Sequence, residues 1–166
     1  MINGIYFLSS KDFDVQDSID GKLLSLNADI KGLNLVLFYS NECKYCDDVI
    51  TEFKKLPHHI FGCSFSMINL NQNPHVTALS RDTITKLAYV PEIILFLDNL
   101  PYSKFEGDAK LEEIQTFIRE ISKNLENHSF TRNVETNLIK EEVKIKDELP
   151  HCKKSKKVCY IQENYI

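Results

Sequence analysis

Two cysteines stand three positions apart in the stretch Cys43-Lys44-Tyr45-Cys46. A pair with this spacing serves thiol–disulfide exchange or supplies half of a metal site. In exchange, one thiolate attacks a disulfide sulfur, and the second thiol is close enough to attack the resulting mixed disulfide. We assign Cys43 as the nucleophile and Cys46 as the resolving thiol.

A central strand and a following helix are predicted to position this pair. Residues 35–39 form a continuous apolar run without alternation, which is typical of a strand covered on both faces. Apolar residues then recur at helical spacing from position 49 to position 56, before Pro57, so we expect a helix that begins near Cys43. Free N–H groups and the helix dipole at this end favour the Cys43 thiolate.

Charged neighbours modify this effect. Lys44 favours the Cys43 thiolate further, whereas Glu42, Asp47 and Asp48 oppose it. The sequence leaves the balance open, and Glu42 and Lys44 are therefore candidate modulators of the site.

The remaining apolar patterns predict the rest of an α/β domain. Further strands are expected at residues 5–8, 63–70, 90–96 and 102–105, and helices at residues 76–84 and 111–121. The leucines within residues 23–26 either cover one edge of the core or begin a helix. Beyond residue 125 apolar residues thin out and charges crowd in, so residues 126–166 are expected to be partly helical, around residues 138–143, or disordered.

The order of these elements resembles the thioredoxin superfamily. The resemblance rests on the C-x-x-C at a strand-to-helix junction and on Val90-Pro91, which leads a buried strand about 45 residues later. It covers residues 5–124, roughly three quarters of the chain. It implies a thioredoxin-like three-layer sandwich over residues 1–125, in which helices flank a central mixed β-sheet, followed by a charged C-terminal tail over residues 126–166.

The resemblance also implies a substrate-binding surface. The family's cis-proline maps to Pro91, which would hold the backbone of Val90 beside Cys43, where it can pair with an extended substrate segment. Tyr45, between the two cysteines, joins Val90 and Pro91 as a candidate substrate-binding residue.

Three departures from thioredoxin predict a different substrate preference. Leu37 stands where thioredoxins have a buried acid, and Glu42 is only a weak substitute for that proton acceptor. Glu42 also replaces the tryptophan before the first cysteine, and Lys44-Tyr45 replaces the Gly-Pro between the cysteines.

The five cysteines also allow roles other than exchange between Cys43 and Cys46. Zinc binding by Cys43 and Cys46 would need further ligands, for which His58, His59 or the pair His151 and Cys152 are available. Cys63 opens a predicted strand and is most simply a core residue. Cys152 and Cys159 flank a lysine-rich run with C-x6-C spacing, and they are either a shuttle pair that exchanges electrons with the first dithiol or two incidental thiols.

The residues together predict a thiol–disulfide oxidoreductase. Its partners would be disulfide-containing proteins and a thiol reductant or oxidant, and the exchange needs no bound organic cofactor. The competing hypothesis is a protein-binding module with an idle or zinc-binding dithiol.

Composition and charge limit the partners and the cellular locations that the sequence predicts. The net charge of −4 and the isoelectric point near 5.7 argue against nucleic acid as a partner. Because neither a signal peptide nor a run of about 20 apolar residues is found, we expect a cytoplasmic protein that does not bind membranes. The abundance of Ile, Asn and Lys suggests an AT-rich coding sequence, as in some protists, bacteria and large DNA viruses; a viral source would make packaging in the virion a second expected location.

Overall fold

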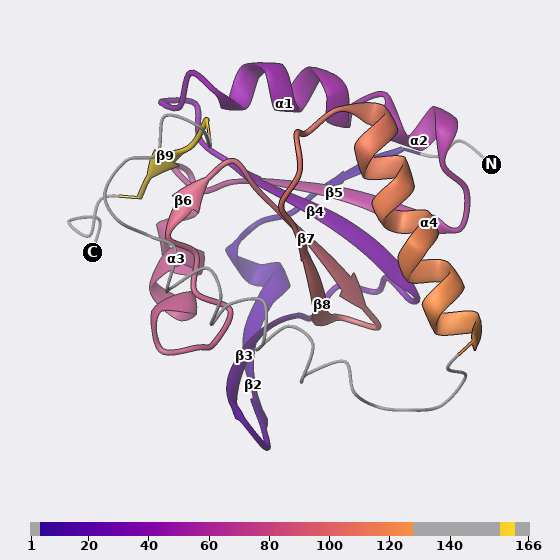
Figure 1. The fold of residues 1–166 in the computed structure, drawn as a ribbon. Helices are drawn as coiled ribbons and strands as arrows, with labels where there is room; N and C mark the ends of the chain where they lie inside the picture. The colour runs from indigo at the N-terminus through magenta and orange to yellow at the C-terminus, as the bar shows by residue number, and fades with distance from the viewer. Residues whose placement is uncertain (1–3, 128–156, 162–166) are drawn as a thin grey trace.

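A five-stranded mixed β-sheet forms the centre of the molecule, as Figure 1 shows. The computed structural model describes residues 4–127 and 157–161. The strand order is β1-β5-β4-β7-β8, with β1 and β4 parallel to β5, and with β7 antiparallel to both β4 and β8. The strands are β1 (Ile5–Phe7), β4 (Leu33–Tyr39), β5 (Cys63–Asn69), β7 (Glu92–Leu97) and β8 (Leu100–Phe105).

Strand β4 lies in the middle of the sheet, where apolar layers cover the side chains of its apolar run on both faces. Successive side chains of a strand point to opposite faces, so Leu35 and Leu37 enter one apolar layer while Val36 and Phe38 enter the other. All four side chains are fully buried. The buried central strand that the sequence predicted is thereby confirmed.

Helices α1 (Cys46–Phe53), α2 (Leu56–His59) and α4 (Leu111–Asn127) cover the face that holds Leu35 and Leu37. The long helix α4 contributes Ile114, Ile118 and Ile121 to this layer. Helix α3 (Pro74–Arg81) and a hairpin of β2 (Phe13–Ser18) and β3 (Gly21–Leu26), which follows the 3-10 turn Ser10–Asp12, cover the other face. The predicted α/β three-layer sandwich is therefore confirmed.

Three elements differ from the sequence-based expectation. Residues 21–26 form a hairpin strand, because Leu24 and Leu26 reach the core while the strand pairs with β2. The predicted helix near Cys43 begins at Cys46 instead, after a turn, and α2 is a separate short helix. The predicted strand over residues 90–96 is interrupted at Pro91, which separates β6 (Tyr89–Val90) from β7, since a proline has no N–H to donate.

A short strand from the C-terminal region pairs with β6. Strand β9 (Cys159–Tyr160) runs antiparallel to β6, an element that the sequence did not predict. Helix α4 begins at Leu111 as predicted and ends at Asn127, beyond the predicted end at residue 121. The helix expected around residues 138–143 and the cysteine at position 152 lie outside the described residues. None of the described helices is long and apolar enough to cross a membrane.

Candidate active site

A tight turn joins the central strand to α1 and carries both cysteines. The Cys43 N–H donates to the Ser40 carbonyl at 3.3 Å, and the Cys46 N–H donates to the Cys43 carbonyl at 3.1 Å. Cys46 is the first residue of α1, and Cys43 lies three positions earlier. Their exposed fractions are only 2% for Cys43 and 0% for Cys46. The thiols therefore lie beneath other side chains.

Val90 lies directly against Cys43. The Cys43 thiol donates a hydrogen bond to the Val90 carbonyl oxygen across 3.5 Å. The Val90–Pro91 peptide bond is cis. Cys43 follows the end of β4 and Val90-Pro91 precedes β7, and because these strands are antiparallel neighbours, the two segments meet at the same end of the sheet.

Strand β9 occupies the edge of β6 beside these residues. Cys159 stands opposite Val90, and Tyr160 stands opposite Tyr89. The Ile161 N–H donates to the Ala88 carbonyl at 2.9 Å. The rings of Tyr89 and Tyr160 meet edge to face with centroids 6.2 Å apart. Strand β9 of the chain itself therefore already occupies the edge of β6 at Val90.

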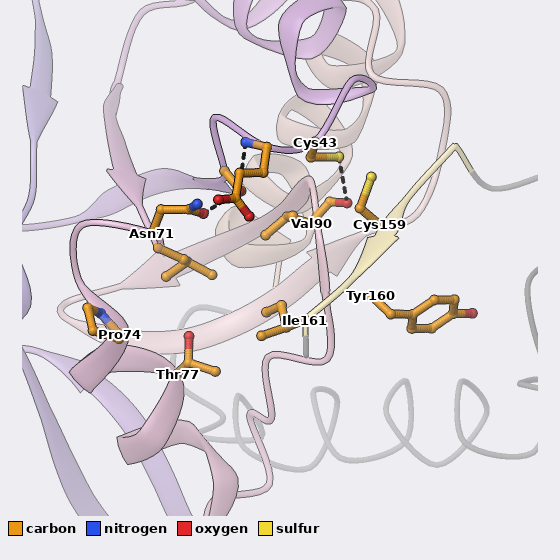
Figure 2. A pocket seen from close by; sticks show the side chains of 11 residues that line it. Cys43, Asn71, Pro74, Thr77, Val90, Cys159, Tyr160 and Ile161 are labelled. Carbon is orange, nitrogen blue, oxygen red and sulfur yellow. Dashed lines mark hydrogen bonds between the residues drawn. The ribbon is translucent and has the colours of Figure 1, made fainter. Parts of the chain in front are cut away.

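A pocket of about 250 Å³ opens where β9, α3 and the Cys43 turn meet. Figure 2 shows the side chains around it, with the Cys159 sulfur beside that of Cys43. At the opposite wall the Ser40 hydroxyl donates to the Asn71 side-chain oxygen. The pocket is lined by Ser40, Glu42, Cys43, Leu70, Asn71, Pro74, Thr77, Val90, Cys159, Tyr160 and Ile161.

Burial disfavours ionisation of two thiols at the site. It is the main cause that raises the pKa of Cys46 far above its usual range, and interaction with Cys43 adds to the effect. Burial also raises the pKa of Cys159, again with a contribution from Cys43, while the backbone at Tyr45 and Lys44 acts in the opposite direction. Cys43, Cys46 and Cys159 therefore form one interacting group of thiols.

The remaining predicted site residues surround this group. Tyr45 is half-buried at the N-cap of α1, and the Lys44 ammonium lies 5.0 Å from the centre of its ring. Glu42 is exposed at the pocket rim. Leu37 belongs to the apolar layer under α1 and α4, so this position contributes packing and no ionisable group.

The residues considered for zinc are placed differently. His58 and His59 lie in α2, beyond the far end of α1 from Cys46. Among the residues that the structure describes, no group of three or more His, Cys, Asp and Glu side chains could hold a metal ion. The histidine at position 151 and its neighbouring cysteine lie outside that part of the chain. Cys63 begins β5, where burial raises its pKa to about 12.

Sequence reasoning missed most of the pocket lining. Asn71, Pro74 and Thr77 come from the turn and the helix that follow β5, and nothing in their local pattern relates them to Cys43. A signal for β9 was available, because residues 158–161 are a short run of β-branched, aromatic and sulfur-containing residues next to a lysine-rich run. The run is too short to predict its pairing partner.

The fold and the dithiol define the class of this protein as thioredoxin-like. The thioredoxin family model matches residues 24–120, more than half of the chain, and the chain belongs to the thioredoxin family.

Two viral proteins are similar in sequence. Uncharacterized protein 196R of Invertebrate iridescent virus 6 is 32% identical over 89 residues, which cover 54% of this chain and 51% of that protein. Uncharacterized protein 020R of Invertebrate iridescent virus 3 is 23% identical over 164 residues, which cover 95% of this chain and 93% of that protein. The chain thus spans about half of the first relative and nearly all of the second.

Solved structures share the fold at low identity. Human ERp44 superposes with a TM-score of 0.53 and 16% identity, over 72% of this chain and 30% of that one. Thioredoxin f2 of Chlamydomonas reinhardtii superposes with a TM-score of 0.52 and 19% identity, over 70% of this chain and 95% of that one. These similarities show the thioredoxin fold of the chain.

Proposed function

We propose that this chain is a thiol–disulfide oxidoreductase that acts on protein disulfides through Cys43 and Cys46. The observation that carries the proposal is the 3.5 Å contact between the Cys43 sulfur and the Val90 carbonyl. Val90 belongs to β6, whose edge pairs with the extended segment β9. A substrate segment paired there would present its disulfide to Cys43.

The reaction consists of two exchange steps. The Cys43 thiolate attacks one sulfur of the substrate disulfide, the S–S bond breaks, and the other sulfur leaves as a thiolate that takes up a proton. Cys46 then loses its proton and attacks the Cys43 sulfur, which frees the second substrate thiol. The substrate gains two electrons, and the Cys43 and Cys46 thiols give up two electrons and two protons. The reverse sequence would oxidise a substrate dithiol.

The high pKa of Cys46 makes the second step the demanding one. A thiol that ionises poorly is a slow attacking group, and the position of the thioredoxin acid is occupied by the buried Leu37. We therefore expect the mixed disulfide on Cys43 to persist longer than it would beside a readily ionised thiol.

A redox titration combined with turnover tests this function. The protein is equilibrated in glutathione buffers, and the thiols are counted by alkylation and mass spectrometry. Cleavage after Lys44 places Cys43 on residues 32–44 and Cys46 on residues 45–54. We expect the pair to oxidise together between roughly −270 and −120 mV, the range of known dithiol enzymes.

Substitutions assign the roles. Cys43→Ser should reduce turnover of a disulfide-bonded protein by about 100-fold or more, because it removes the attacking thiol that lies 3.5 Å from the Val90 carbonyl oxygen. Cys46→Ser should accumulate the mixed disulfide, and Cys63→Ser is the matched control that should retain turnover. Failure of Cys43 and Cys46 to oxidise as a pair, together with no turnover, would contradict the proposal.

A protein-binding module is the second candidate. It is favoured by the deep burial of both thiols and by the occupied edge of β6. In that case, a Cys43→Ser variant would retain every partner of the parent protein, and the parent would show no turnover.

A further inference from the structure

We propose that Cys159 is a second resolving thiol, which attacks the mixed disulfide on Cys43 and forms a Cys43–Cys159 disulfide within the chain. This inference rests on the proposed exchange function and adds a third cysteine to it. The supporting observations are the register of β9 on β6 and the pocket that Cys43 and Cys159 both line.

The strand register selects Cys159 for this role. Cys159 stands opposite Val90, the residue whose carbonyl accepts the hydrogen bond from Cys43. Because side chains alternate along a strand, Cys159 and Ile161 pack on the apolar layer that includes Cys43, while the Tyr160 ring packs on Tyr89. A shift of one residue would turn the thiol away from Cys43.

Several contacts hold this register. The Ile161 N–H bonds to the Ala88 carbonyl at 2.9 Å, and Tyr160 packs edge to face on Tyr89. Cys159 and Ile161 both pack against the apolar layer that includes Cys43 and Cys46. The segment is therefore anchored at the two residues that directly follow the Cys159 thiol.

The local environment suits a resolving thiol better than that of Cys46. Cys159 is partly exposed, whereas Cys46 is fully buried at the start of α1. The Cys159 thiol interacts with the Cys43 thiol and with the backbone at Lys44 and Tyr45. Burial raises the pKa of both resolving candidates, and the backbone at Lys44 and Tyr45 partly opposes that rise at Cys159.

The exchange step is balanced without a further reagent. An external disulfide, from a substrate protein or from glutathione disulfide, first forms a mixed disulfide with Cys43 and releases one thiol. Cys159 loses its proton to water, its sulfur attacks the Cys43 sulfur, and the bond to the external sulfur breaks. The external disulfide gains two electrons, and Cys43 and Cys159 are oxidised to a disulfide.

Strand β9 would also help to expel the product. A substrate segment that pairs with Val90 uses the edge that β9 occupies, so the two segments exclude each other. Return of β9 to this edge removes the backbone contacts of the substrate and brings Cys159 to Cys43 in the same movement.

Peptide mapping of the oxidised full-length chain tests the inference. Trypsin cleaves after Lys and Arg, which places the five cysteines on separate peptides: residues 32–44, 45–54, 56–81, 147–153 and 158–166. The parent, Cys46→Ser and Cys46→Ala chains are oxidised with glutathione disulfide, quenched in acid and digested. We expect residues 32–44 to be linked to residues 158–166 in all three chains, and most abundantly in the two variants.

A register variant is the matched control. Val158→Cys combined with Cys159→Ser retains one thiol in the segment but moves it to the position just before β9, where alternation along an extended chain turns the side chain away from Cys43. We expect its link to residues 32–44 to fall by about tenfold or more, since a strand-held thiol has a higher effective concentration than a merely tethered one. Equal yields from both positions would overturn the proposal.

Three other outcomes would also overturn it: an absent 43–159 link, a link from residues 147–153 as abundant as that from residues 158–166, or a link found only between two copies on a non-reducing gel. A failure of this inference can be distinguished from a failure of the proposed function. If Cys43 and Cys46 still oxidise as a pair with turnover, only the role of Cys159 fails; if they do not, the dithiol function itself fails.

Discussion

The carbonyl oxygen of Val90 lies 3.5 Å from the sulfur of Cys43, although 47 positions separate the two residues in the chain. Any segment that pairs with β6 at Val90 therefore lies beside the Cys43 thiol. In this structure that segment is β9, and Cys43 is consequently almost fully buried. The behaviour of the site depends on how firmly β9 is held.

Loosening β9 should expose Cys43. Ile161 is partly buried against the apolar layer around the site, so Ile161→Asp would oppose docking of the segment. Loss of an apolar anchor of this size costs about 1.5–3 kcal/mol, and we expect iodoacetamide to modify Cys43 about tenfold faster or more. The rate is measured by mass spectrometry on residues 32–44.

Ile19→Asp is the control for this change. Ile19 is 98% exposed in the turn between β2 and β3, so its replacement adds the same charge without touching the site. Equal modification rates in the two variants would show that β9 does not protect Cys43.

The buried ion pair of Lys104 and Glu92 should be costly to break. Their side chains are 5% and 1% exposed, and the pair joins β8 to the start of β7. Removal of one partner leaves a buried charge, so Lys104→Met should lower the free energy of unfolding by about 3–5 kcal/mol. Urea denaturation measures this change.

Two further variants test whether the lower stability of Lys104→Met comes from a buried charge without its partner. The double variant Glu92→Leu with Lys104→Met should recover most of the stability, because no charge remains buried. Lys55→Met breaks a surface pair with Glu52, whose contact is 2.8 Å, and should leave the free energy of unfolding nearly unchanged because water screens the pair. A loss for Lys104→Met as small as that for Lys55→Met would contradict the prediction.

The stability of the reduced protein should fall in alkaline solution. Burial raises the pKa of Cys63 and of Tyr89 to about 12 each, and it raises the pKa of Cys46 as well. The folded state then retains protons that the unfolded state, with a thiol pKa of about 8.5, has released. The free energy of unfolding should therefore decrease as the pH rises from about 9 to about 12.

A Cys63→Ala variant isolates one of these groups. Urea denaturation at a series of pH values should give a slope that is smaller by about one proton in this range. Ile19→Ala, which removes no titrating group, should retain the parental slope. A parental profile that stays flat above pH 9 would be inconsistent with protonated thiols in the folded core.

Local patterns in the sequence were sufficient for most of the framework. The apolar run of β4 and the periodic leucine and isoleucine positions of α4 each carry their own signal, because burial on both faces or on one helical face repeats within a few residues. The dithiol likewise rests on residues close together in sequence, and the resemblance to the thioredoxin superfamily adds Val90-Pro91 and the order of the predicted elements. The catalytic roles of Cys43 and Cys46 remain predictions.

Only the tertiary structure decided where the C-terminal segment lies. Strand β9 has two residues, too few to show a period, and its partner β6 is equally short. Their pairing depends on an edge left open beside Pro91 and on an apolar layer assembled from several elements. The sequence by itself determined the dithiol and the sandwich that carries it, whereas long-range packing alone placed Cys159 opposite Val90.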